Sequence, residues 1–196
     1  MEIVTYVDNL WILIAGILVM FMQPGFMLVE TGFTRSKNSV NIVMKNFMDF
    51  SVGALTYWAF GFAFAYGGST LGGFIAYGNF FLEGDSSTYF FQVVFAATAA
   101  TIVSGSVAER TKFSSYLLFQ PFICGLIYPI VTHWVWSGQG WLTDIGFVDF
   151  AGSGVVHMVG GFAALAGIQV VGPRIGKFDS NGKPLPIPGS SMVAAA

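Results

Sequence analysis

Charged residues are scarce in this 196-residue chain: they make up 9% of the sequence, whereas hydrophobic residues make up 55%. Soluble domains carry about 25% charged residues. A chain with so few charges cannot cover a water-soluble globule with polar side chains, so the composition excludes that class and predicts a membrane protein. Because the two halves of the chain look alike in composition, we expect one compact bundle.

Residues that hold metals or form disulfides are nearly absent. The single cysteine, Cys124, can form no internal disulfide, and two histidines with one cysteine give no zinc pattern. No nucleophile and base stand at helical spacing, so we expect no catalytic residue, no metal, no cofactor and no enzyme activity. Basic residues never cluster beyond pairs and the net charge is −2, which argues against nucleic acid as a partner.

Long apolar runs are what the sequence has instead. A helix needs about 20 apolar residues to span a bilayer, and it satisfies its own backbone groups in lipid. The alternation typical of barrel strands is absent. The sequence therefore predicts an all-α, polytopic transmembrane helix bundle over residues 1–173, followed by a cytoplasmic linker or tail over 174–196. The five predicted spans are residues 9–29, 45–66, 88–107, 113–136 and 150–171.

The charges indicate how such a bundle lies in the membrane. The connections on one side hold acidic residues such as Glu83 and Asp144, and all the basic residues lie on the other side. By the positive-inside rule, we expect a multi-pass protein of the plasma membrane with its N-terminus outside and its C-terminus in the cytoplasm. The basic residues are Arg35, Lys37, Lys45, Arg110, Lys112, Arg174, Lys177 and Lys183.

One histidine, His157, lies in the middle of the fifth predicted span. If that helix starts near Asp149, a rise of about 1.5 Å per residue puts the ring roughly 12 Å deep, near the middle of a hydrocarbon core of about 30 Å. An ionisable side chain there indicates function. The alternative is a neutral histidine that hydrogen-bonds neighbouring helices together.

Asp149 and the aromatic residues mark the outer end of the spans. A carboxylate at a helix start caps the backbone N–H groups, and we expect its negative field to attract cations as a consequence. Most aromatics there are typical of an interfacial belt. Phe95, about two turns inside the third span, and Trp136, at the end of the fourth, are placed where ring faces could bind a cation, for roughly 0.5–2 kcal/mol each.

Three stretches resemble the ammonium transporter (Amt/Mep/Rh) family. They read "QPGFMLVETGFTRSKNSVNIVMKN", "FQVVFAATAATIVSGSVAERTKFS" and "DFAGSGVVHMVGGFAALAGIQVVGPR". The matches occur in family order over nearly all of residues 9–189. The resemblance implies a homotrimer in which each subunit has eleven spans and its own pore, with spans one to five and six to ten related as inverted repeats. This chain would be the first repeat.

The resemblance also implies roles for particular residues. His157 matches the pore histidine of the fifth span, which in the family pairs with a second histidine of the tenth span. Trp136 matches the tryptophan of an outer aromatic site, and Phe95 a phenylalanine of the gate region beneath it. Phe91, four residues before Phe95, fits the family spacing, and Asp149 matches the aspartate that supports the outer site.

The function that the resemblance implies is transport of ammonium or ammonia across a lipid membrane. The cation would be captured at the aromatic site, and the neutral species would pass the histidine. The second histidine and the rest of the gate have no counterpart in these 196 residues, so we expect the chain to be part of a longer one. The alternative function is an ammonium sensor fused to a cytoplasmic signalling module. A cytoplasmic regulatory protein is a further partner that the resemblance allows.

Overall fold

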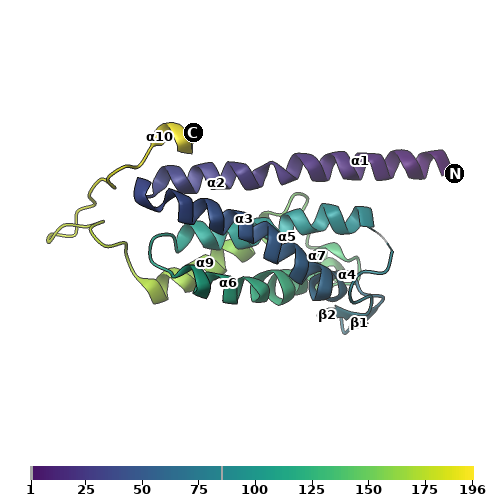
Figure 1. The fold of residues 1–196 in the computed structure, drawn as a ribbon. Helices are drawn as coiled ribbons and strands as arrows, with labels where there is room; N and C mark the ends of the chain where they lie inside the picture. Colours follow the sequence, from purple (N-terminus) through teal and green to yellow (C-terminus); the bar gives the residue numbers. More distant parts are fainter. Residues whose placement is uncertain (1, 85) are drawn as a thin grey trace.

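The computed structural model describes residues 2–84 and 86–196, and most of that chain is helical. In Figure 1, a long rod formed by the first two helices lies along one side of a group of shorter helices. The predicted all-α class is confirmed. The α-helices are α1 (Glu2–Met20), α2 (Met22–Phe33), α3 (Ser39–Thr56), α4 (Phe62–Tyr66), α5 (Ser86–Ser106), α6 (Phe113–Phe122), α7 (Tyr128–Trp136), α8 (Trp141–Asp144), α9 (Val159–Val171) and α10 (Met192–Ala195).

Shorter elements join or interrupt these helices. The 3₁₀ turn η1 (Ser36–Asn38) leads into α3, and the strands β1 (Ser69–Leu71) and β2 (Ile75–Tyr77) form a hairpin. Three segments are π-helical: η2 (Tyr57–Gly61) joins α3 to α4, η3 (Ile123–Ile127) joins α6 to α7, and η4 (Ser153–Met158) leads into α9.

Four helical stretches of the described chain are long and apolar enough to cross a membrane: Ile3–Phe33, Ser86–Ser106, Phe113–Asp144 and Ser153–Val171. They overlap four of the predicted spans. The remaining one, 45–66, lies within the continuous helix of α3, η2 and α4, which carries Lys45 and Asp49 and is not among the four. The chain thus has several membrane-length helices, and the count of five spans stays a prediction.

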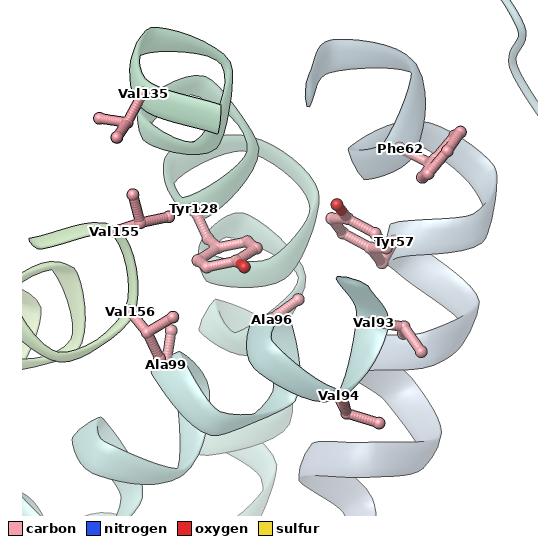
Figure 2. Close-up of a cluster of buried hydrophobic side chains, with 10 residues drawn as sticks. All are labelled: Tyr57, Phe62, Val93, Val94, Ala96, Ala99, Tyr128, Val135, Val155 and Val156. Atoms are coloured by element: carbon pink, nitrogen blue, oxygen red, sulfur yellow. The ribbon is translucent and has the colours of Figure 1, made fainter. Parts of the chain in front are cut away.

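Helix α5 is the centre of the bundle, because it packs against α1, α3 and α9. Its buried alanines let those helices approach closely, which matters in a membrane, where lipid is as apolar as the side chains and packing holds helices together. Figure 2 shows aromatic and valine side chains from η2, α4, α7 and η4 gathered around α5. This cluster consists of Tyr57, Phe62, Val93, Val94, Ala96, Ala99, Tyr128, Val135, Val155 and Val156.

Two of the π-helical segments cross at glycines. A methyl group on Gly125 would lie 2.5 Å from Cγ2 of Thr56, and one on Gly61 would lie 2.7 Å from the carbonyl oxygen of Cys124. Pro129 has no N–H to donate to the carbonyl group of Gly125, so the regular α-helical bond is missing at this point. Close approach and a missing donor together explain why the α-helix gives way here.

The loops 34–38, 107–112 and 172–183 lie together at one end of the bundle, which we call the basic end (Figure 1). Here the carboxylate of Glu109, whose side chain is 2% exposed, forms ion pairs with Arg35 (3.2 Å) and Arg174 (3.0 Å). It also accepts hydrogen bonds from the backbone N–H of Arg35 (2.9 Å) and from Nδ2 of Asn38 (2.7 Å). One carboxylate therefore joins three loops.

The opposite end, which we call the hairpin end, consists of residues 67–84 and 137–152 (Figure 1). His133 anchors it from α7. Its Nδ1 lies 2.9 Å from the carbonyl oxygen of Ala65 and must donate, because a carbonyl only accepts. Its Nε2 is then left to accept from the Thr70 hydroxyl, 2.9 Å away. His133 is 1% exposed and has a structural role.

The segment after α9 folds back along the bundle. The N–H of Ser191 donates to the carbonyl oxygen of Gly32 (2.9 Å), and α10 packs on α2 at this point. Asp179 closes a turn by accepting from the N–H groups of Asn181 and Lys183, at 2.8 Å each. The division of the chain after residue 173 stays a prediction.

Candidate functional site

The chain between α8 and η4 wraps around the carboxylate of Asp149. Oδ1 accepts hydrogen bonds from the N–H groups of Gly152 (2.8 Å) and Ser153 (3.0 Å). Oδ2 accepts from those of Gly154 (2.7 Å) and Val155 (2.8 Å). The first N–H groups of a helix have no partner within the helix, so Asp149 acts as the cap of η4. An ionised carboxylate has about four acceptor sites, and the backbone fills them.

These bonds also set the charge of Asp149. Burial by itself would raise the pKa of this carboxyl, but the hydrogen bonds from Val155, Gly152, Gly154 and Ser153 favour the ionised form and hold the pKa below its ordinary value. The hairpin end therefore carries a negative charge, and backbone N–H groups hold it in place.

Asp149 positions Trp136 through its backbone. The indole Nε1 of Trp136 donates to the carbonyl oxygen of Asp149 (2.7 Å). The ring also covers Gly152, where a methyl group would lie 3.3 Å from Cη2 of Trp136 and 2.6 Å from Cγ2 of Val156. Gly152 has φ 93°, a conformation that favours glycine. Its small size and its conformation are both required for the indole to lie against this turn.

Three aromatic rings from two helices form a row beside Asp149. Phe91 and Phe95 lie on one face of α5, with ring centroids 5.1 Å apart, and Phe95 lies 5.7 Å from Trp136 of α7. The interplanar angles are 79° and 69°, so both contacts are the edge-to-face arrangement that the ring quadrupole favours. All three rings are half-buried. The structure thus brings together Phe91, Phe95, Trp136 and Asp149.

His157 is connected to the same turn. Its Nδ1 lies 3.1 Å from the carbonyl oxygen of Gly152, which also accepts from the backbone N–H of His157 (2.9 Å). Because that oxygen can only accept, Nδ1 carries the hydrogen, and in the neutral ring Nε2 has a lone pair. The ring is exposed on the surface of the chain. Its expected position inside an enclosed pore stays a prediction.

The geometry allows hydrogen bonding and cation binding at this site. Within residues 2–84 and 86–196, no three His, Cys, Asp or Glu side chains gather into a set that could hold a metal ion. What the turn offers is a row of ring faces, a fixed negative charge and one imidazole lone pair. Gly152 links them, because it bonds to Asp149, contacts Trp136 and accepts from His157.

Sequence reasoning missed a second polar group, buried between α2, α3, α5 and α6 near the basic end. The available signal was the pair Lys45 and Asp49, which stand one helical turn apart in a predicted span. Such charges inside a membrane segment usually face the interior and pair with other polar groups. We call these residues the buried polar cluster: Glu30, Lys45, Asn46, Asp49, Thr101, Ser104 and Tyr116.

The chain is similar in sequence to known membrane transporters. The sequence pattern that defines the Ammonium Transporter Family matches residues 10–196. Ammonium transporter Amt2 of Archaeoglobus fulgidus is 50% identical, over 96% of this chain and 43% of that protein. The chain therefore spans less than half the length of this relative.

Solved structures resemble it as well. One titled "Sensor Amt Protein" matches with a TM-score of 0.94 and 38% identity, over 100% of this chain and 52% of that one. The crystal structure of Mep2 from Candida albicans matches with a TM-score of 0.84 and 28% identity, over 96% of this chain and 44% of that one.

Proposed function

This chain belongs to the ammonium transporter family, and from that premise we propose that it forms the first half of a conduit for ammonium or ammonia. Because the chain covers 43% of Amt2 from Archaeoglobus fulgidus, we expect a second half to complete the pore. Transport, substrate and assembly are properties that we propose for the complete protein.

The capture step is proposed at the row of Phe91, Phe95 and Trp136. A cation over an aromatic face gains about 0.5–2 kcal/mol, and more when water is excluded. The contact between the Trp136 indole and the carbonyl group of Asp149 supports this role, because it fixes the ring beside a permanent negative charge. That coupling of ring to carboxylate is the observation on which the proposal depends most.

The conduction step is proposed at His157. A bare cation in hydrocarbon is prohibitively costly, so the substrate must lose its charge before it passes. Ammonium can leave a proton behind and cross as ammonia, which sodium and potassium cannot do. The lone pair on Nε2 of His157 can accept a hydrogen bond from ammonia or ammonium, because Nδ1–H is already bound to Gly152.

The membrane arrangement is proposed from charge. With the basic end in the cytoplasm, the positive-inside rule is satisfied and the aromatic row faces the outside. We propose that the complete protein is a homotrimer in the plasma membrane, in contact with lipid and open to a cytoplasmic regulatory protein. Such a multi-pass arrangement agrees with the four membrane-length helices of the described chain.

A second candidate function is ammonium sensing. It is favoured by the structural match with a TM-score of 0.94, whose title names a sensor. A sensor would bind ammonium at the same aromatic row without letting it cross. Binding and flux therefore have to be measured on the same preparation.

His157→Ala in the complete protein, reconstituted in liposomes, tests the proposal. We expect ammonium flux to fall at least about tenfold, because the apolar passage loses its polar group. Unchanged flux would remove His157 from the mechanism. Wild-type protein that binds ammonium, seen as a change in tryptophan fluorescence, but gives no flux would favour the sensor.

A further inference from the structure

The buried polar cluster contains three ionisable side chains that the proposed transport steps do not use. Glu30 is 6% exposed, Lys45 1% and Asp49 0%. They come from α2 and α3, within helical stretches that we place in the membrane. Ionisable groups are costly in such positions and are rare unless they serve ion or proton pathways.

Glu30 has one carboxyl oxygen that is bonded and one that is not. Its Oε2 accepts hydrogen bonds from Nδ2 of Asn46 and from the hydroxyl of Ser104, both at 3.1 Å. Its Oε1 is buried without a partner. Buried polar atoms without partners are rare, and each one calls for an unseen water, an ion or a functional explanation.

A cavity of about 450 Å³ adjoins this carboxyl and extends toward the basic end. Its wall includes Glu30 of α2 and Ile102 and Gly105 of α5. Oε1 lies on the Gly105 side of Glu30, because a methyl group on Gly105 would come within 3.4 Å of it. The unpartnered oxygen is thus buried against Gly105, in the wall of a cavity that can hold water or a small polar solute.

The same cavity approaches the helix that carries His157. Ile102 lines the cavity, and it also packs against Gly160, where a methyl group would lie 2.8 Å from its Cβ. Gly160 lies about one helical turn after His157. The wall of this cavity therefore lies about one helical turn from His157, on the side of the basic end.

Glu30 takes part in neither of the ion pairs found among the described residues, so no basic side chain is bound to its carboxyl group. Both ion pairs found among the described residues are made by Glu109, with Arg35 and with Arg174. Lys45 donates to the carbonyl oxygen of Ser104 (3.3 Å) and lies 4.5 Å from the ring centroid of Tyr116.

The other charged side chains that face the cluster are engaged in hydrogen bonds. Asp49 accepts hydrogen bonds from Thr101 (3.0 Å) and Tyr116. Arg110, which lines the cavity with Arg174, donates to the carbonyl oxygens of residues 106, 108 and 172. The polar group without a partner at the cavity wall is thus Oε1 of Glu30.

We propose that Glu30 is the proton donor that converts ammonia to ammonium at the basic end of the conduit, an inference that rests on the proposed transport function. The O–H bond at Oε1 breaks, an N–H bond forms with the lone pair of ammonia, and the carboxylate keeps the electron pair. A hydronium ion from water at the basic end then protonates Oε1 again. Charge and atoms balance in both steps.

The geometry suits both steps. A proton on Oε1 leaves the two hydrogen bonds to Oε2 intact, and a small rotation of the carboxyl group brings Oε1 to the cavity. The ammonium formed lies in a cavity lined by Arg110 and Arg174, which repel it toward water. Conduction requires that a site release its ion as readily as it binds it, and like charge at the exit satisfies that requirement.

Glu30→Gln in the complete protein tests this inference. The amide keeps the size and an acceptor oxygen but cannot exchange a proton at cavity pH. In liposomes with the basic end inside, we expect wild-type inward flux to rise as internal pH falls. We expect E30Q to lower maximal flux by about tenfold or more and to abolish that dependence. The apparent affinity for external ammonium should not change, because capture occurs at Trp136.

The matched control is Asp179→Asn, which removes a carboxylate from an exposed turn of the linker and should behave as wild type. If the E30Q protein fails to assemble, E30D is measured instead, and it should retain the dependence on internal pH at reduced flux. E30Q with wild-type flux and wild-type dependence on internal pH, or E30D without that dependence, would overturn the inference and leave the transport proposal intact. No flux in wild type and D179N would overturn the proposed function, and this inference with it.

Discussion

At residue 149, one carboxylate sets the geometry of the hairpin end. The four N–H groups that bind it belong to consecutive residues, 152 to 155, so the side chain fixes both a turn and the start of η4. The backbone carbonyl of the same residue fixes the Trp136 ring. The aspartate thus fixes the ring through its backbone and places a negative charge beside it.

Asp149→Asn tests this arrangement. An amide nitrogen donates and cannot accept, so two of the N–H groups lose their acceptor, at a cost of about 1–3 kcal/mol each. We expect a lower melting temperature of the complete protein and at least about a tenfold loss of ammonium uptake. Asp144→Asn, an exposed acid at the same end, is the control. Normal melting and uptake in D149N would refute the positioning role.

Trp136→Leu tests the capture site. The substitution removes one ring face, worth roughly 0.5–2 kcal/mol, so apparent affinity for ammonium should weaken about 2- to 30-fold while maximal flux changes less. Trp134→Leu is the matched control, because Trp134 donates to the carbonyl oxygen of Phe74 and contacts Trp141 edge to face, outside the aromatic row. A loss of maximal flux with unchanged affinity would place capture elsewhere.

Among the elements, the loops of the basic end are joined to one another by Glu109, which makes both ion pairs found in the described chain. Burial would raise the pKa of Glu109, but the hydrogen bonds and charges of Arg35, Asn38 and Arg174 outweigh it and lower the pKa below 4.5. A depressed folded-state pKa gives stability that is present above the unfolded value and is lost as pH falls through the folded value.

Glu109→Gln should therefore loosen the linker after α9. Hydrogen bonds to charged groups contribute about 1.5–3 kcal/mol, and the amide keeps only part of that. At neutral pH, we expect trypsin to cleave E109Q faster than wild type at Arg174 and Lys177. In wild type, the linker should loosen to a comparable degree only in acid, and hydrogen exchange measures that loosening. Glu83→Gln at the hairpin end is the control. Equal cleavage rates of E109Q and wild type would contradict the proposed role of Glu109 in holding the linker.

The elements also show what a sequence reveals. Apolar runs of about 20 residues predicted five spans, and four of them overlap membrane-length helices of the described chain, because helix formation in lipid depends on local composition. Neither the hairpin of β1 and β2 nor the π-helical segments could be predicted. The hairpin depends on a buried contact between Thr70 and His133, 63 residues apart, and η3 depends on where Gly125 meets Thr56.

Prediction of the candidate site was limited for the same reason. The positions of Phe91, Phe95, Trp136, Asp149 and His157 came from their place in the spans and from family resemblance. The contacts that relate them, above all the Trp136 bond to the carbonyl group of Asp149, join different elements. Glu30 gave no signal at all, since a single glutamate in an apolar helix looks like an interface residue until its neighbours are known.

At the scale of the whole molecule, the described chain leaves His157 exposed on its surface. The chain covers 43% of Amt2 from Archaeoglobus fulgidus and 52% of a solved structure that it matches with a TM-score of 0.94, and we propose that its exposed His157 faces a pathway in the complete protein. On this account the aromatic row, His157 and the cavity beside Glu30 follow one another along α5, from the hairpin end to the basic end.

The most direct test is the ratio of ammonium flux to potassium flux through the complete protein in liposomes. The two cations have the same charge and nearly the same size, so both can bind an aromatic face, but only ammonium can give up a proton and pass His157 uncharged. We predict ammonium flux well above that of protein-free liposomes and potassium flux equal to it. Potassium flux comparable to ammonium flux would contradict the account.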